Sequence, residues 1–231
     1  MQALPGSPPR VLFEDTHLLV VDKPAGLLSQ GDVGGEPSLV DWLRVHVGRN
    51  YVGLIHRLDR GTSGLLVVGK RTKAAQRLTQ SLQDGSLERR YVALLWGSLS
   101  APATWRHHLI KDERKNEVRV ARPSEPGAKD AALDVKPLTR GSLPEGPVTL
   151  AEFTLQTGRS HQIRVQAAAC GHPLVGDVKY GSDRARVLGR PALHSHFVSF
   201  PHPMTQERVE IKAPVPEDMK ALLKRAGISQ P

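Results

Sequence analysis

The pattern of apolar and polar positions along the chain predicts short strands and short helices in mixture. Residues 11–13 and 18–21 are apolar runs on either side of a polar turn at 14–16, which predicts a strand pair that ends at the turn 23–26. Uninterrupted apolar runs of this length are typical of buried strands, not of membrane spans. Three further segments have the composition of strands: 65–68, 91–95 and 148–156.

Four segments carry apolar residues at the three- and four-residue spacing of a helix. Ser38, Thr72 and Ser160 can each cap the first turn of one of them, because a hydroxyl accepts a hydrogen bond from the free N–H groups there. The fourth begins near Pro216 with acidic residues in its first turn, which the helix dipole favours. The apolar stripes are Val40, Leu43 and Val47; Ala75, Leu78 and Leu82; Ile163, Ala167 and Cys170; and Met219, Leu222 and Leu223.

Strands and helices follow one another without regular βαβ alternation, which predicts an α+β fold with a mixed, largely antiparallel central sheet flanked by helices. Residues 1–9 are rich in Pro, Gly and Ser and are expected to form a flexible N-terminal arm. Residues 10–231 are expected to form a single domain. The charged stretch 111–122 predicts an exposed hairpin and loop, whose cations are either a solvated face or contacts to phosphate.

The charge of the chain indicates which class of partner it binds. Its 231 residues carry a formal net charge of +9, with a pI of about 10.0, so the surface attracts polyanions. Nucleic acid is the leading partner class, and plain solubility is the alternative. The single cysteine, Cys170, excludes an internal disulfide and is expected to be a small core residue and not a metal ligand. We find no leader or membrane-length apolar run and expect a cytoplasmic protein.

The segment HRLDRGTSGLLVV at 56–68 places one carboxylate, Asp59, among cations and small turn residues just before an apolar run. Reactive carboxylates are expected at such a strand edge. The segment resembles the signature of the RluA-type pseudouridine synthases, and other parts of the chain resemble the same family. These are FEDTHLLVVDKPAG at 13–26, ERRYVA at 88–93, TGRSHQIRV at 157–165 with GHPLVGD at 171–177, and LHS at 193–195 with FPHP at 200–203.

The resemblance implies the pseudouridine synthase fold and an isomerase that acts on uridine in structured ribosomal or transfer RNA. It implies that Asp59 is the catalytic carboxylate, that Arg164 pairs with it, and that Tyr91 lies against the uracil ring. Arg57 would fill the space of the flipped nucleotide. The remaining predicted RNA contacts are His56, Arg60, Arg159 and His161. The reaction changes no oxidation state, so we expect neither a cofactor nor a metal.

Each of these residues also has an ordinary structural interpretation. Asp59 could simply cap its turn, Arg164 could lie on a helix surface, and Tyr91 could be a core residue of its strand. Arg57 could form a plain salt bridge. The chain also departs from the family: Gln166 stands where His is common, and we expect no small RNA-binding domain before the catalytic part.

Two other functions remain open from the sequence. A noncatalytic RNA-binding factor could keep the same fold, although Asp59, Tyr91 and Arg164 are all present. A glycosidase-like or metal-dependent hydrolase would need a second acidic residue or paired metal ligands, which no motif supplies. The sequence does not identify the RNA, the uridine or the first chemical step. No heptad seam calls for a dimer, so we expect a monomer.

Overall fold

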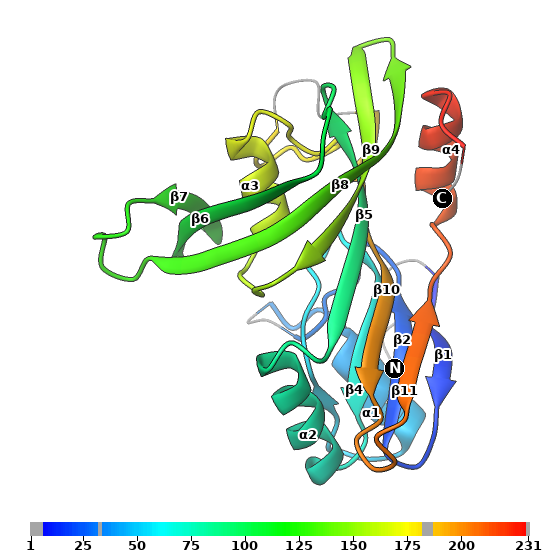
Figure 1. Ribbon diagram of the computed structural model, residues 1–231. Coiled ribbons are helices and arrows are strands. Elements are labelled where there is room, and N and C mark those ends of the chain that lie inside the picture. The colour runs from blue at the N-terminus through cyan, green and yellow to red at the C-terminus, as the bar shows by residue number, and fades with distance from the viewer. Residues whose placement is uncertain (1–6, 32–33, 182–186, 230–231) are drawn as a thin grey trace. The chain divides into compact units, whose positions relative to one another are not determined.

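The computed structural model describes residues 7–31, 34–181 and 187–229, and the chain forms two compact units (Figure 1). The first unit comprises Met1–Arg89 and Ser195–Pro214, and the second comprises Arg90–His194 and Val215–Pro231. Residues 1–6 of the predicted arm lie outside the described residues, whereas Pro9 is buried. Both units combine strands with helices, which confirms the predicted α+β class.

The strands of the first unit form a sheet in the order β1-β2-β4-β10, with β3 paired to β4 and β11 paired to β10. The pairs β1–β2, β2–β4, β3–β4 and β10–β11 are antiparallel. Leu18 and Val21 are fully buried because β2 lies between two strands with both faces covered, which explains the continuous apolar runs. The bounds are β1 (Arg10–Glu14), β2 (Leu18–Lys23), β3 (Gly53–Leu54), β4 (Ser63–Gly69), β10 (Leu193–Pro201) and β11 (Arg208–Lys212).

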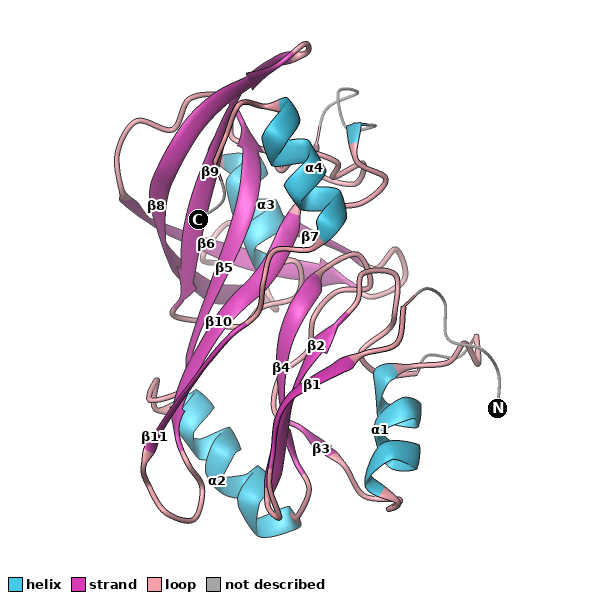
Figure 2. Cartoon of the chain, turned by 90° about the vertical axis from the view of Figure 1, so that its right-hand side faces the viewer, coloured by secondary structure: helices cyan, strands magenta, loops and turns pink. Residues whose placement is uncertain are grey.

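Two helices accompany this sheet, and Figure 2 shows them on opposite sides of its strands. In α1 (Leu39–Val47) the predicted cap is confirmed: Ser38 and Asp41 form a capping box, and Gly48 ends the helix in the left-handed conformation. In α2 (Thr72–Gln83) the predicted cap is wrong. Arg71, with extended backbone, precedes the first turn and no side chain caps it, so Thr72 is already helical.

The face of the first sheet that α2 covers holds a continuous apolar core. Ala75 and Leu78 of α2 pack with residues from β2, β4 and β10, whose side chains alternate toward that face. The members from the strands are Leu18, Val20, Leu65, Val67, Val198 and Phe200. This core fixes β4, and with it the segment that leads into β4 from His56.

The strands of the second unit pair antiparallel in the order β5-β9-β8-β6-β7, and this part of the sheet is called the second sheet below. The predicted exposed hairpin is confirmed, since β6 and β7 pair across the turn at 113–116. β8 is the longest strand, and its register with β9 shifts between Pro137 and Thr139, where proline cannot donate to the ladder. The bounds are β5 (Glu88–Trp96), β6 (Ala103–Asp112), β7 (Glu117–Ala121), β8 (Lys129–Leu143) and β9 (Gly146–Leu155).

Two helices pack on opposite faces of this second sheet. Val165 of α3 (Gln162–Ala169) packs with Leu109 and Val118. Met219 of α4 (Glu217–Arg225) packs with Val92, which belongs to the other set of alternating side chains. The predicted cap of α3 is wrong. Ser160 makes no cap, and instead the Gln162 side chain turns back and accepts the N–H of Arg159 at 2.9 Å.

Candidate active site

The segment that carries Asp59 is a tight turn that leads into the fully buried strand β4. The N–H of Thr62 donates to the carbonyl of Asp59 at 3.0 Å and closes the turn. Gly64 follows with a φ of +113°, and a Cβ atom there would lie 2.2 Å from the backbone oxygen of Ser195. Only glycine fits this position, because a side chain would meet backbone. The turn leaves Asp59 half-buried and both Arg57 and Arg60 exposed.

A second loop, residues 23–29, holds this turn from the side. The ammonium of Lys23 is fully buried and donates to the carbonyls of Pro24 (2.9 Å), Leu27 (2.7 Å) and Arg60 (3.4 Å). The N–H of Gly26 also donates to the Arg60 carbonyl, at 2.8 Å. A buried ammonium is tolerated only when its protons are bonded in this way. The backbone directly after Asp59 is therefore fixed by groups from a different strand end.

Arg60 is already engaged within the first unit. Its Nε donates to the carbonyl of Gly26 at 3.0 Å, and its two terminal nitrogens bind Glu36 at 3.1 and 2.7 Å. This fork is half-exposed, so its contribution to stability is small. Phosphate could compete with Glu36 for the same guanidinium, and the RNA contact of Arg60 stays a prediction.

His56 is buried, at 8% exposure, and its Nε2 accepts the N–H of Val67 at 3.4 Å. Burial, and next the charge of Arg89, lower the pKa of His56 to about 3. The imidazole is therefore neutral at physiological pH. Its burial favours a structural role beneath the turn over the RNA contact that the sequence suggested.

The buried imidazole makes the stability of the fold depend on pH. Unfolded His56 titrates near 6.5, so below that pH the unfolded chain binds the additional proton and the free energy of unfolding falls. From pH 7 to pH 5 we expect this residue to account for a loss of about 2 kcal/mol. Urea unfolding at both pH values measures it. In His56→Gln, which can still accept the Val67 N–H, the loss should be smaller by that amount; equal losses in both proteins would contradict the account.

In the second unit, Tyr91 lies on β5 and is 4% exposed. It pairs with Phe153 of β9, so its side chain belongs to the face of the sheet that α3 covers. Trp105 of β6 stacks edge-on against Phe153 with ring centroids 5.8 Å apart. Tyr91 thus lies in a buried part of the sheet that contains other aromatic residues.

Arg164 is buried in the first turn of α3 and binds a carboxylate that the sequence did not point to. Its Nε and Nη2 donate to the two oxygens of Asp177 at 2.7 and 2.8 Å. Asp177 is 1% exposed and also accepts the N–H of Lys179 at 3.1 Å. The guanidinium carbon lies 5.0 Å from the ring centre of Tyr180. This fork and the contact with the ring fix the direction of the guanidinium.

His161 and Arg159 lie just before this helix. His161 adopts the left-handed conformation, with φ of 51°, and its Nδ1 lies 2.6 Å from the hydroxyl of Tyr180. Arg159 is exposed and its Nε donates to the carbonyl of Asp130 at 2.8 Å. His161 and Arg164 therefore share Tyr180 as a neighbour, although His161 precedes the helix and Arg164 lies in its first turn.

The structure brings Arg164 and His161 together within the second unit, and it places His56, Arg57 and Arg60 beside Asp59 along the first. Asp59 belongs to one unit and Tyr91 and Arg164 to the other, so their common site stays a prediction. Sequence reasoning missed the supporting roles of Lys23, Asp177 and Tyr180. All three lie in or next to segments that resemble the family, which is the signal that could have drawn attention to them.

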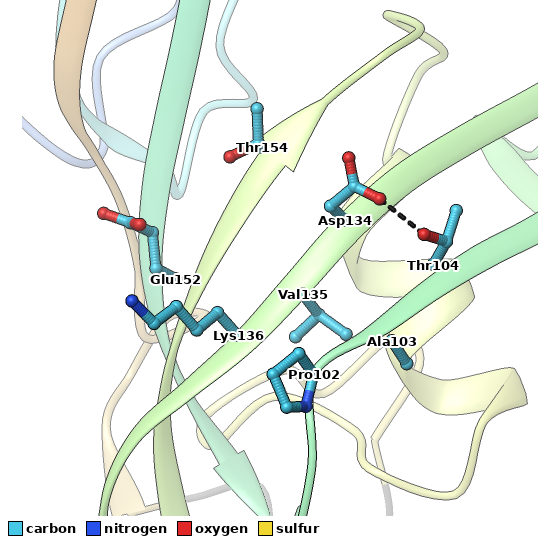
Figure 3. A pocket seen from close by; sticks show the side chains of 8 residues that line it. All are labelled: Pro102, Ala103, Thr104, Asp134, Val135, Lys136, Glu152 and Thr154. Carbon is cyan, nitrogen blue, oxygen red and sulfur yellow. Dashed lines mark hydrogen bonds between the residues drawn. The ribbon is translucent and has the colours of Figure 1, made fainter.

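A separate polar groove lies on the second sheet (Figure 3). Its carboxylate Asp134 accepts hydrogen bonds from Thr104 at 2.6 Å and Gln156 at 2.8 Å, which lower the pKa of Asp134 below its ordinary value. Glu152 and Thr154 also line it and flank Phe153 in β9, so their side chains leave the face that Tyr91 occupies. The groove is thus distinct from the predicted catalytic residues.

Two general findings concern ligands and membranes. Within residues 7–31, 34–181 and 187–229, no group of three His, Cys, Asp or Glu side chains could hold a metal ion. Cys170 caps the end of α3 and is half-buried, and burial raises the pKa of its thiol. In the same described part, no helix is long and apolar enough to cross a bilayer.

Comparison with known proteins identifies the family of this chain. Residues 17–169 match the RNA pseudouridylate synthase family. An uncharacterised RNA pseudouridine synthase of Bacillus subtilis is 36% identical over 217 residues, covering 92% of this chain and 70% of that protein. The ribosomal large subunit pseudouridine synthase D of Zymomonas mobilis is 34% identical, covering 96% of this chain and 74% of that protein. The corresponding synthase C of Pasteurella multocida is 35% identical, with coverages of 93% and 67%.

Solved structures agree in fold. The human protein RNA pseudouridylate synthase domain containing 1 has a TM-score of 0.75 at 24% identity, covering 99% of this chain and 100% of that one. The class defined by the fold and the matched segments is that of the isomerases that make pseudouridine in RNA. Within this class, the chain belongs to the RluA-type RNA pseudouridine synthases, as the resemblance of its motifs predicted.

Proposed function

We propose that this chain isomerises a specific uridine of ribosomal RNA to pseudouridine through Asp59. Ribosomal RNA is favoured over transfer RNA because relatives at 34 and 35% identity are named as ribosomal large subunit synthases. The match over residues 17–169 is the observation that carries the proposal, because it includes the Asp59 turn, Tyr91 and Arg164. The positive net charge supports binding to the RNA backbone.

In the proposed reaction, the bond between ribose C1′ and uracil N1 breaks and a bond between C1′ and C5 forms. The proton at C5 leaves and N1 gains one, so the reaction is an isomerisation without a redox change. The Asp59 carboxylate acts at the ribose, where carboxylates serve as nucleophile or base. Arg164 supplies the positive charge that keeps Asp59 ionised, and Tyr91 stacks on the uracil and assists loss of the C5 proton.

We assign the proposed RNA contacts to side chains that are accessible to solvent. Arg57 is exposed beside Asp59, and we propose that it fills the space left by the flipped nucleotide. Arg60, Arg159 and His161 are proposed phosphate or sugar contacts. His56 supports the turn from within. We further propose that the two units act together as one catalytic domain, in a cytoplasmic monomer that needs no cofactor.

The test uses purified protein with large-subunit ribosomal RNA and, separately, with transfer RNA, both lacking modifications. Pseudouridines are mapped by carbodiimide labelling and primer extension. We expect new pseudouridine at a defined position of the ribosomal RNA and none in transfer RNA. Modification of transfer RNA alone would overturn the assignment of ribosomal RNA as the substrate. Release of free uracil would instead indicate a hydrolase, and tight binding without product a noncatalytic RNA-binding factor.

A further inference from the structure

Leu58, the residue directly before Asp59, is held at both of its backbone polar groups by one side chain. The Oγ of Ser29 donates to the carbonyl of Leu58 at 2.6 Å and accepts the N–H of Leu58 at 3.1 Å. Ser29 is 4% exposed and Leu58 is 6% exposed, so water does not readily replace these bonds. A single hydroxyl can serve both groups because it carries one donor and two acceptor sites.

The backbone of Leu58 needs this hydroxyl because it lies outside any strand or helix. Without Ser29, a buried N–H and a buried carbonyl would lose these partners, and such groups are strongly disfavoured. The segment would shift to reach water or another partner. Asp59 follows Leu58 immediately, so any such shift moves the carboxylate.

The other side of Asp59 is anchored separately. The carbonyl of Arg60 accepts hydrogen bonds from the N–H of Gly26 and the ammonium of Lys23, at 2.8 and 3.4 Å. The loop 23–29 therefore forms hydrogen bonds to the residues before and after Asp59, and Ser29 makes those to the residue before it. Because the backbone is fixed at the residues on either side of Asp59, the Cα atom from which the carboxylate side chain extends is held in place.

We propose that Ser29 is a positioning residue for the isomerisation: its hydroxyl sets the place of the Asp59 carboxylate through the backbone of Leu58. The inference rests on the proposed role of Asp59. Ser29 touches no substrate in this role and is not needed for RNA binding. Because a displacement of about 1 Å at a reacting group costs about 10²-fold in rate, loss of the hydroxyl lowers the rate of the chemical step.

The experiment compares Ser29→Ala with a matched control, Thr149→Val. The Thr149 hydroxyl is also fully buried and also bridges two backbone groups, accepting the N–H of Leu99 at 3.0 Å and donating to the carbonyl of Gly97 at 2.8 Å. It belongs to the second unit, far along the chain from Asp59. Each substitution removes one buried hydroxyl with the same pair of bonds, so both carry a similar penalty in stability.

Single-turnover rates are measured at saturating ribosomal RNA, together with the RNA Kd and the Tm. We expect Ser29→Ala to slow the reaction about 10- to 100-fold with an RNA Kd within about twofold of wild type. Thr149→Val should keep the rate within about twofold despite a similar fall in Tm. If Ser29→Ala does not fold, Ser29→Cys carries the test, since its thiol fills the position but is only a weak donor and acceptor.

Two outcomes would overturn the inference: a Ser29→Ala rate within about twofold of wild type, or an equal loss of rate in Thr149→Val. Asp59→Ala is assayed beside them. A fully active Asp59→Ala protein would refute the proposed function itself, whatever the Ser29 variants do. An inactive Asp59→Ala protein with a fully active Ser29→Ala protein would refute only the positioning role.

Discussion

Replacing Asp59 by alanine is expected to abolish pseudouridine formation, with a loss of at least about 10⁴-fold in the single-turnover rate. The loss follows if the carboxylate takes a direct part in breaking the bond between ribose and uracil, because no neighbouring group in its turn can replace it. Asp59 is half-buried at the start of a well-anchored turn, so removal of its carboxylate should leave the fold and most of the RNA affinity unchanged. The rate, the RNA Kd and the Tm measure these three expectations.

Asp59→Asn and Asp22→Asn are the controls for this prediction. The first keeps the shape of the side chain and removes its charge, and should be as inactive as the alanine variant. The second removes a carboxylate of the same unit, whose partner is the exposed Arg10 at 2.6 Å, and should retain wild-type activity. A well-folded Asp59→Ala protein with normal turnover would refute the assignment of the catalytic residue.

Replacing Arg164 by lysine is expected to lower the rate by about 10²- to 10³-fold while RNA still binds. Lysine keeps the charge but cannot form the fork that Arg164 makes with both oxygens of Asp177. Nor does its ammonium reproduce the contact of the planar guanidinium with the Tyr180 ring. The charge would therefore remain in the helix but lose its fixed direction. Rate and Kd, measured separately, show whether chemistry or binding is affected.

The chain offers a close control for the Arg164 substitution. Arg190 binds Asp218 with the same geometry, at 2.7 Å from Nε and 2.8 Å from Nη2. Arg190→Lys removes a fork with the same distances from the same unit, with a more exposed carboxylate and outside the proposed site, and should keep the wild-type rate. Equal losses in rate for the two variants would mean that Arg164 matters only for the stability of the second unit.

Local patterns in the sequence predicted the elements whose stability is local. Leu18 and Val21 lie in a strand buried on both faces, which makes the apolar run continuous and easy to find. The predicted strand pair at the start and the cap at Ser38 are confirmed for this reason. The caps assigned to Thr72 and Ser160 were wrong, because hydroxyls near a helix start only permit a cap. At α3 no side chain caps the first turn, and the Gln162 side chain instead binds the N–H of Arg159 before the helix.

Elements stabilised by distant contacts were not visible in the same way. β10 is buried along most of its length, but it carries polar Ser195 and Ser199 at almost fully buried positions, so its sequence lacks the continuous apolar run that its burial would suggest. β8 contains Pro137 and Gly141, which argue against a strand in isolation. Its pairing with two neighbours overrides that local preference.

In the candidate site, too, some residues could be predicted from the sequence and others could not. The resemblance to the family predicted Asp59, Tyr91 and Arg164, but not the residues that contact and orient them. Ser29 and Asp177 act through backbone or side-chain contacts that span 29 and 13 residues of sequence. Such contacts depend on tertiary packing, so no short motif displays them. The buried state of His56 likewise follows from the packing around β4 and not from its place in the signature.

The most direct test of the central claim is pseudouridine mapping of total RNA from cells that lack this gene. The deletion strain is complemented with wild type or with Asp59→Ala, and the two maps are compared with the parent strain. We expect one site in ribosomal RNA to vanish on deletion and to return only with the wild-type gene. Return of the modification with Asp59→Ala, or an unchanged map after deletion, would contradict the account.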